Sequence, residues 1–327
     1  MKEGLLSYLV CPQCSQPLRL TVEKQDREIE AGKFQCGNSH SFKITEFIPR
    51  FTDEVYTSNF GMQWRKFSKT QVDLYNGTKI SKERFFNETR WDSAWMKGKK
   101  ILDAGCGSGR FTQIAIEAGA EVFACDQSQA VDACRENFPA SENLSIFQAD
   151  LLQLPFPDRF FDAIFSLGVI QHTPSPQKTF LALVRHLKQG GRMAIDSYPY
   201  RWYQFLQPKY LLRSLLKAQP PERIFELCQK WLPPVLSFRN KFKRVPGLRP
   251  LIQKIFPIAD YKEQFPMLTQ EQAYEWMLLE SCDSLAAYYD SPQSAHSLRQ
   301  WFKEAGFTDL EIEDHGSLVA RGVLCVG

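Results

Sequence analysis

Between residues 98 and 198, short apolar runs alternate with amphipathic stretches, and the first run ends in the glycine-rich turn Asp103-Ala-Gly-Cys-Gly-Ser-Gly109. The apolar runs predict strands over residues 100–104, 121–125, 144–148, 161–167 and 192–197. The helical spacing of apolar residues predicts helices over residues 110–118, 129–137 and 177–187, the last ended by Gly190-Gly191. Strands that alternate with helices of this length predict an α/β fold, with a parallel sheet and helices on both faces.

The rest of the chain is arranged around this alternating core. Residues 285–327 return to the same pattern, with a helix over 294–305 and strands over 308–313 and 318–326 that are close enough to pair antiparallel. We therefore expect five parts: a cysteine-bearing segment 1–50, an aromatic-rich helical segment 51–97, the core 98–198, a helical insertion 199–284 after the fifth strand, and the end of the core 285–327.

The composition is that of an ordinary globular protein, with 43% hydrophobic and 24% charged residues. No apolar stretch is long enough to cross a bilayer, and the first residues, Met1-Lys2-Glu3-Gly4, do not resemble a signal peptide. We therefore expect a cytoplasmic protein, in which the nine cysteines stay reduced and clustered cysteines bind metal.

Acidic residues follow three successive predicted strands, at Asp103, Asp126 and Asp150. The carboxyl ends of parallel strands meet at one edge of the sheet, where such folds bind ligands. The glycines have the spacing G-x-G-x-G rather than the G-x-G-x-x-G of dinucleotide sites, and position 110 is Arg. A carboxylate at Asp103 would repel a pyrophosphate but favour a cationic ligand such as S-adenosylmethionine (SAM). Asp126 then suits the ribose hydroxyls and Asp150 the adenine side, although acids here can also simply cap loops.

These residues resemble the motifs of class I SAM-dependent methyltransferases of the type 11 kind. Residues 99–111 are similar to the glycine-rich first motif, Asp126 to the ribose-binding acid, Ala149-Asp150-Leu151 to the adenine-side motif, and 161–172 to the fourth strand and its loop. The resemblance implies a Rossmann-like sheet in which backbone groups near Gly105, Ser166 and Leu167 hold the methionine half. The cofactor residues implied are Asp103, Gly105, Cys106, Gly107, Gly109, Asp126, Gln127, Asp150, Leu151, Ser166 and Leu167.

Four potential metal ligands form two close pairs near the start of the chain: Cys11 with Cys14, and Cys36 with His40. Thiolates and imidazole in this arrangement suit tetrahedral Zn²⁺, and four protein ligands would make the site structural. The alternative is a set of unliganded thiols. Residues 18–30 between the pairs are predicted to form a β-hairpin. The segment resembles the zinc ribbon of some rRNA guanine methyltransferases and of small methyltransferase activators, but the residues after Pro49 do not continue as in the rRNA enzymes.

The insertion is strongly basic over residues 199–265, where 13 Lys and Arg face 4 Asp and Glu. Its charge of +9 leaves the rest of the chain at 3 − 9 = −6. Aromatic and leucine residues are interleaved with the basic ones over residues 200–217. We favour a helical lid over the acceptor pocket, ahead of a peripheral contact with anionic lipid and of an RNA-binding surface.

His172 follows the fourth predicted strand at the ligand edge of the sheet and is the best candidate for a general base. The alternative is a histidine that only organises the loop. Five further residues are weaker candidates for lining the pocket: Tyr198, Tyr288, Tyr289, Asp290 and His296.

The leading hypothesis is O- or N-methylation of a small-molecule, glycan or lipid-linked acceptor. The elements Phe-Gly-Met-Gln-Trp at 60–64 and Tyr-Asp-Ser-Pro-Gln at 289–293, with the ribbon and insertion, resemble a group of bacterial methyltransferases associated with surface glycans and secondary metabolites. Two alternatives stay open: an RNA (rRNA or tRNA) methyltransferase that grips RNA with the ribbon and insertion, and a non-catalytic SAM-binding regulator. The acceptor and the oligomeric state are open at this point.

Overall fold

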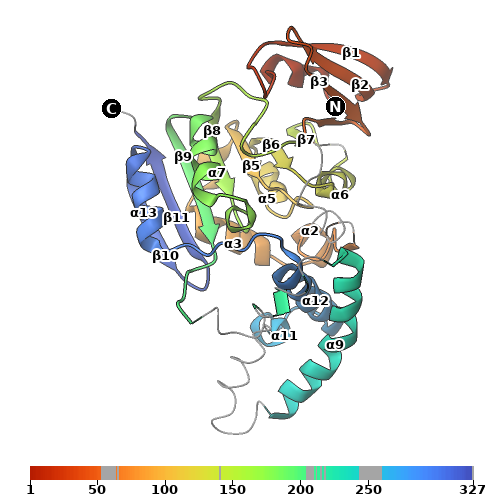
Figure 1. Ribbon diagram of the computed structural model, residues 1–327, viewed down its shortest axis with the longest axis vertical. Helices are drawn as coiled ribbons and strands as arrows, with labels where there is room; N and C mark the ends of the chain where they lie inside the picture. Colours follow the sequence, from red (N-terminus) through yellow and green to blue (C-terminus); the bar gives the residue numbers. More distant parts are fainter. Residues whose placement is uncertain are drawn as a thin grey trace.

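The computed structural model describes residues 1–52, 64, 66–139, 141–203, 210, 212–213, 216, 219–242 and 260–325. Within these residues, eleven strands form one sheet in the order β1-β2-β3-β4-β7-β6-β5-β8-β9-β11-β10 (Figure 1). The predicted element 60–64 lies outside the described residues except for Trp64, as does most of the basic aromatic stretch 200–217.

The centre of the sheet is parallel. It comprises β5 (Lys100–Ala104), β6 (Glu121–Asp126), β7 (Leu144–Gln148), β8 (Phe161–Ser166) and β9 (Leu187–Ser197). Their spatial order, β7-β6-β5-β8-β9, is the doubly wound order in which the chain reverses direction next to the first strand. Antiparallel β11 (Leu318–Leu324) and β10 (Phe307–Asp314) complete this side, as expected. The predicted Rossmann-like fold is confirmed.

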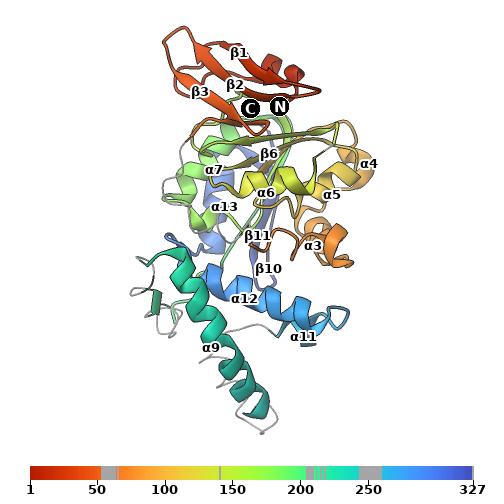
Figure 2. The same ribbon diagram turned by 90° about the vertical axis from the view of Figure 1, so that its right-hand side faces the viewer.

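Helices cover both faces of the sheet (Figure 2). One face carries α3 (Ile80–Thr89), α4 (Ser93–Met96), α5 (Thr112–Glu117) and α6 (Ala130–Asn137). The other face carries α7 (Pro176–Arg185) and α13 (Ala295–Glu304). The strand residues are buried on both sides because each face of the sheet has its own apolar layer.

The amino-terminal segment extends the same sheet. It consists of a short 3-10 helix, η1 (Glu3–Tyr8), and strands β1 (Leu18–Gln25), β2 (Ile29–Cys36), β3 (Ser41–Thr45) and β4 (Ile48–Arg50), which we call the ribbon. Strand β4 pairs in parallel with β7 through Arg50 and Gln148. The ribbon also shares an apolar core with β6, α7 and α13, and Tyr8 packs edge-on against Phe123, with ring centroids 5.9 Å apart.

Two predicted boundaries were wrong. The hairpin predicted over 18–30 extends from Leu18 to Cys36, because β1 and β2 pair along their whole length. The helix predicted to reach Leu187 ends at Arg185, and Gly190-Gly191 lies inside β9 rather than before it. There the backbone carbonyl of His186 already accepts hydrogen bonds from Phe160 and Phe161 at 2.8 and 2.9 Å, so sheet pairing begins before the glycines.

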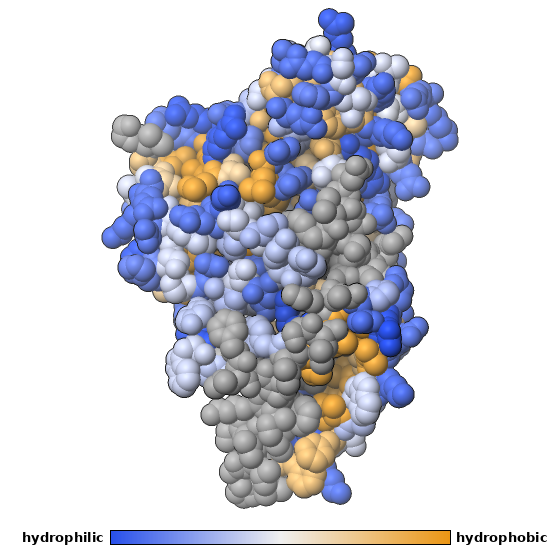
Figure 3. All heavy atoms as spheres, viewed as in Figure 1, coloured by the Kyte–Doolittle hydropathy of each residue, from blue (hydrophilic) through white to orange (hydrophobic). Residues whose placement is uncertain are grey.

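The insertion is helical where the structure describes it. Helix α9 (Pro221–Phe242) packs against α12 (Gln270–Ala286), and α11 (Tyr261–Gln264) adjoins α12 at its amino-terminal side. Helix α2 (Asp73–Asn76) lies nearby, tied to α12 by the hydrogen bond from Gln272 to the carbonyl of Asn76. On the face shown in Figure 3, hydrophobic atoms gather beside α9, whereas the ribbon is mainly hydrophilic. No helix in the described part of the chain has the length and apolar character to cross a bilayer.

Candidate cofactor and acceptor pocket

A cavity of about 590 Å³ opens at the carboxyl ends of β5, β6, β7 and β8. Residues of α11, α12 and the β10–β11 turn form its opposite wall, so the insertion closes over the edge of the sheet. Nine of the predicted site residues line this cavity: Gly105, Cys106, Gly107, Asp126, Gln127, Asp150, Leu151, Leu167 and His172. A cavity of this size suits a nucleoside cofactor together with part of an acceptor.

The glycine turn is held in a conformation that other residues adopt at a cost. Gly105, Gly107 and Gly109 have φ values of +94°, +53° and +92°. The N–H groups of Gly105 and Cys106 both donate to the carbonyl of Cys125, at 2.7 and 2.9 Å. A Cβ on Gly105 would lie 2.4 Å from the Val169 side chain, so the turn also has no room for one.

Asp126 is fixed by its neighbours at the end of β6. Its carboxylate accepts hydrogen bonds from the N–H of Gly107 at 3.0 Å and from the N–H and hydroxyl of Ser128 at 2.9 and 2.7 Å. Burial raises the pKa of the Asp126 carboxyl, while these bonds lower it. The carboxylate also lines the cavity, where its oxygens can accept from a ligand hydroxyl.

The adenine-side residues lie beside it. The Asp150 carboxylate accepts from the N–H of Leu152 at 2.9 Å, which orders the loop after β7. The backbone carbonyl of Gln127 accepts from the side chain of Gln148 at 2.8 Å. Gln127, Asp150 and Leu151 therefore form one wall whose shape depends on β7.

Three predicted cofactor residues do not line the cavity: Asp103, Gly109 and Ser166. Asp103 accepts a hydrogen bond from the Thr112 hydroxyl at 2.6 Å, and burial raises the pKa of its carboxyl to about 7. The Ser166 hydroxyl donates to the carbonyl of Ala104 at 2.9 Å. The Asp103 carboxylate is thus hydrogen bonded to the first residue of α5, and its contact with a cationic ligand stays a prediction.

His172 lies in the short helix η2 (Ile170–His172) after β8 and lines the cavity. Its Nδ1 is 3.0 Å from the backbone carbonyl of Tyr289, and the N–H of Ser291 donates to the carbonyl of Gln171 at 2.9 Å. These contacts attach the loop after β8 to the segment after α12. They also place the ring proton on Nδ1, because a carbonyl only accepts.

Of the weaker candidates, Tyr198 lines the cavity, and burial raises the pKa of its hydroxyl well above the usual range. Tyr288, Tyr289, Asp290 and His296 do not line it. Tyr289 contributes its backbone carbonyl to His172, and Asp290 forms an ion pair with Arg213 at 3.5 Å.

Four charged residues of the cavity lining were not predicted from the sequence. Arg84, Arg110, Glu280 and Asp283 all line the cavity. Burial raises the pKa of the Glu280 and Asp283 carboxyls, and Asp283 is hydrogen bonded to Tyr198. Acids one turn apart in the apolar run of α12 were the available signal, because a charged residue on a buried helix face needs a partner or a ligand.

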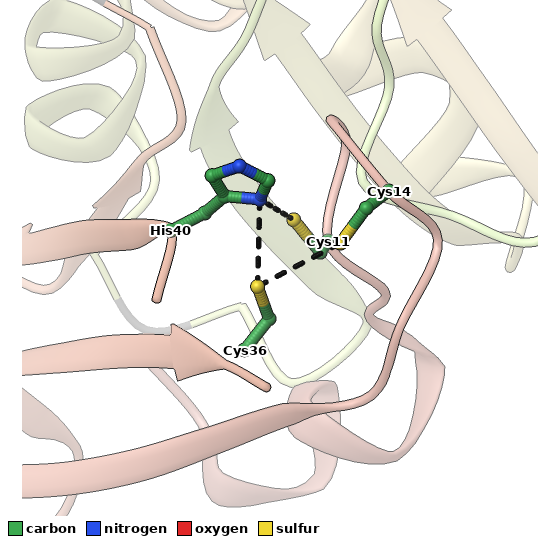
Figure 4. A group of neighbouring side chains, drawn as sticks. All are labelled: Cys11, Cys14, Cys36 and His40. Atoms are coloured by element: carbon green, nitrogen blue, oxygen red, sulfur yellow. Dashed lines mark hydrogen bonds between the residues drawn. The ribbon is translucent and has the colours of Figure 1, made fainter. Parts of the chain in front are cut away.

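The four predicted metal ligands converge at one end of the ribbon (Figure 4). The Sγ atoms of Cys11 and Cys36 lie 3.4 and 3.5 Å from Nδ1 of His40, and Sγ of Cys14 lies 3.7 Å from that of Cys36. All four ligand atoms lie within 4.8 Å of one another. A tetrahedral zinc with Zn–S bonds of about 2.3 Å has S···S edges of about 3.8 Å, so the donor set and spacing fit this ion.

Comparison with known families matches residues 102–195 to a methyltransferase domain. The sterol 24-C-methyltransferase of Pneumocystis carinii is 32% identical over 111 residues, which is 32% of this chain and 28% of that protein. The tRNA U34 carboxymethyltransferase of Hydrogenovibrio crunogenus is 31% identical over 151 residues, 39% of this chain and 44% of that protein. The chain thus spans less than half the length of these relatives.

Among solved structures, magnesium protoporphyrin IX methyltransferase from Synechocystis with bound SAH aligns with a TM-score of 0.43 and 15% identity, covering 82% of this chain and 96% of that one. A complex of the Haloferax volcanii Trm112 methyltransferase activator with a methyltransferase aligns with a TM-score of 0.45 and 16% identity, covering 82% and 99%. The match to the methyltransferase domain over residues 102–195 coincides with the parallel strands of the Rossmann-like sheet described above.

Proposed function

We propose that the chain transfers the methyl group of SAM to a hydroxyl or amine of a small-molecule, glycan or lipid-linked acceptor. The observation that carries the proposal is that Asp126, the glycine turn and Asp150 line one cavity within the methyltransferase domain. Bound SAM supplies a methyl group already activated by its sulfonium. The protein then has to hold cofactor and acceptor in line and manage the acceptor proton.

The cavity matches this cofactor in its chemistry. Asp126 and Asp150 offer carboxylates for hydroxyl and amino groups, and Gly168 presents open space where a side chain would intrude. Asp103, Gly109 and Ser166 do not line the cavity, and their direct contact with the cofactor stays a prediction.

Isothermal titration of the purified chain with SAM, S-adenosylhomocysteine (SAH) and NAD tests this. We expect binding of SAM and SAH but not NAD, and a loss of at least about tenfold in SAH affinity for Asp126→Ala, because a charged hydrogen bond to ribose is removed. Asp158→Ala, at an exposed ion pair, is the matched control. Unchanged SAH affinity in Asp126→Ala would remove the basis of the assignment.

His172 is proposed as the general base. With its proton held on Nδ1 by the Tyr289 carbonyl, Nε2 is the basic nitrogen. An acceptor hydroxyl or amine at the cavity wall then loses its proton to Nε2 as the methyl group arrives. His172→Ala should keep SAH affinity and lose turnover by about 10²–10⁴-fold. Normal turnover in this variant would reduce His172 to the loop contact with Tyr289.

The cavity lining has both acidic and basic side chains, since Glu280, Asp283 and Asp196 lie in it with Arg84 and Arg110, so its charge is compatible with a neutral, cationic or carboxylate-bearing acceptor. An RNA acceptor is the second candidate, favoured by the tRNA-directed relatives. RNA binding that weakens steeply between 50 and 200 mM salt would support it. Transfer of label from SAM to lipid, glycan, small-molecule or RNA fractions would identify the acceptor class.

The insertion is proposed as the lid of this cavity, since α11 and α12 provide its outer wall. Helix α9 also exposes Trp231 and Phe238. A peripheral contact with anionic lipid is therefore a further prediction, tested by sedimentation with vesicles of phosphatidylglycerol or phosphatidylcholine.

The ribbon is proposed to hold one structural Zn²⁺ through Cys11, Cys14, Cys36 and His40. Four protein ligands leave no open position, so the ion would stabilise the fold and not take part in catalysis. Metal analysis of the purified protein should find about one zinc per chain, and Cys11→Ser with Cys36→Ser should remove it. One zinc per chain in that double variant would place the ion elsewhere.

A further inference from the structure

Arg110 follows the glycine turn directly and is nearly buried, with 9% of its surface exposed, yet it lines the cavity. Its Nε donates to the Ser81 hydroxyl at 2.9 Å and its Nη1 to the side-chain oxygen of Gln71 at 3.0 Å. The guanidinium lies against the rings of Phe111 and Trp276, 5.0 and 5.4 Å from their centroids. Its orientation is therefore fixed from two sides.

Arg110 differs from the other buried arginines in the described part of the chain, each of which has a carboxylate partner. Arg213 pairs with Asp290 at 3.5 Å and Arg239 with Asp260 at 3.0 Å. Arg321 pairs with Glu313 at 2.7 Å. No carboxylate of the described residues lies within 4.0 Å of Arg110. A buried guanidinium without a counter-charge is costly unless a ligand supplies one.

The surroundings of Arg110 show that the missing charge is not provided by its neighbours. Burial and the nearby Arg84 together lower the pKa of Arg110 to about 10. Arg84 is itself balanced by Asp196 and Glu88, at 2.6 and 2.8 Å. Glu280 and Glu88 offset part of this lowering, but Glu280 is hydrogen bonded to Gln71 at 3.3 Å and Glu88 is paired with Arg84.

We propose that Arg110, positioned by Gln71 and Ser81, binds the carboxylate of a ligand in the cavity. This rests on the proposed function. A guanidinium has five N–H donors, of which Ser81 and Gln71 take two, so a planar carboxylate can be bound by the remaining ones. Glu280 nearby disfavours a dianion such as phosphate over a monoanion.

Two carboxylates could occupy this subsite: that of the methionine half of SAM, and one on the acceptor. The first carboxylate is part of the cofactor and the second is part of the acceptor, so the two can be tested separately.

The first arm of the test compares SAM with decarboxylated SAM, which lacks only the carboxylate, by isothermal titration. The wild type should bind SAM about 10- to 100-fold more tightly. Arg110→Gln should lose this preference by weakening SAM alone, and Arg110→Lys should retain part of it. Arg185→Gln, at an exposed ion pair, is the matched control and should behave as the wild type.

The second arm applies if Arg110→Gln leaves SAM affinity unchanged. The SAH-saturated protein is then titrated with benzoate and with neutral benzamide. Binding of benzoate, but not benzamide, that is lost in Arg110→Gln would assign the subsite to the acceptor. Absence of an effect in both arms overturns the proposal.

A purely structural role for Arg110 gives a different result. Arg110→Gln would then weaken SAM, decarboxylated SAM and 5′-methylthioadenosine equally and lower the melting temperature, which also overturns the proposal. Failure of the wild type to bind any adenosyl ligand would instead contradict the proposed function itself.

Discussion

Gly109 has a φ of +92°, and a Cβ there would lie 2.5 Å from the Phe138 ring and 3.0 Å from Sγ of Cys134. Gly109→Ala therefore combines backbone strain with overpacking and should lower the free energy of unfolding by about 2–4 kcal/mol. Gly190→Ala is the matched control, because Gly190 has a φ of +70° but nothing within 4 Å of its Cβ position. It should cost only about 1 kcal/mol.

Denaturant unfolding of both variants measures this difference. Equal losses at the two glycines would show that the space behind the turn is not the limiting factor.

Asp103 makes stability depend on pH. Burial raises the pKa of its carboxyl from 3.8 to about 7, so the folded protein keeps this proton over a range in which the unfolded chain has lost it. The Asp103 contribution to stability is therefore fully present below the unfolded value and falls as pH rises from about 4 to 7. Asp103→Asn cannot ionise and should gain about 1 kcal/mol or more relative to wild type between pH 5 and pH 8.

The measurement is the free energy of unfolding of both proteins at pH 5 and pH 8 without ligand. A difference between them that is the same at both pH values would mean that Asp103 is ionised in the fold throughout.

The residues visible from sequence were those tied to local motifs. Asp126, Asp150 and the glycine turn follow strands that lie next to each other, so chain order alone places them at one edge. Glu280, Asp283 and Tyr261 are more than 100 residues later, and only the docking of α11 and α12 brings them to the cavity. Arg110 was seen as a departure from the dinucleotide pattern, but its missing counter-charge is a property of the folded surroundings.

At the scale of elements, we expect the stability of the ribbon to depend on the four proposed zinc ligands. Loss of the proposed zinc should free two turns, and the ribbon core, which includes Cys11 and Cys36, would loosen. Chelation should lower the melting temperature by about 5 °C or more, with recovery on adding Zn²⁺. Cys325→Ser, at the exposed cysteine of the described chain, is a control that should leave both the zinc content and the melting temperature unchanged.

Thermal melts before and after chelation provide the test. A melting temperature insensitive to chelator, in protein shown to have lost its metal, would rule out a stabilising ion.

Most elements of the core were predictable because their apolar periodicity is local, and β5, β7 and α6 lie within a residue of expectation or match it. The pairing of β4 with β7 was not predictable. It depends on the single backbone bridge between Arg50 and Gln148. The side chains of the same two residues, about a hundred positions apart, are also hydrogen bonded, with Nη1 of Arg50 donating to Oε1 of Gln148 at 3.1 Å. No short-range pattern encodes which edge of a sheet a ribbon joins.

At the scale of the whole molecule, the ribbon and the methyltransferase domain share one sheet and one apolar core. They should therefore unfold together, giving a single calorimetric transition whose van't Hoff and calorimetric enthalpies agree. A tryptophan substituted for Tyr8 would report on the ribbon through its fluorescence. An earlier transition seen only by this probe would contradict the prediction.

The junction at Arg50 has a practical consequence for anyone wishing to shorten this protein. A chain starting after residue 50 would lose the bridge between β4 and β7 at Gln148 and would uncover Phe123, which packs edge-on against Tyr8. Exposed strand edges can pair with strands of other molecules, so the shortened protein should aggregate. We therefore expect the ribbon to protect this edge of the sheet against self-association.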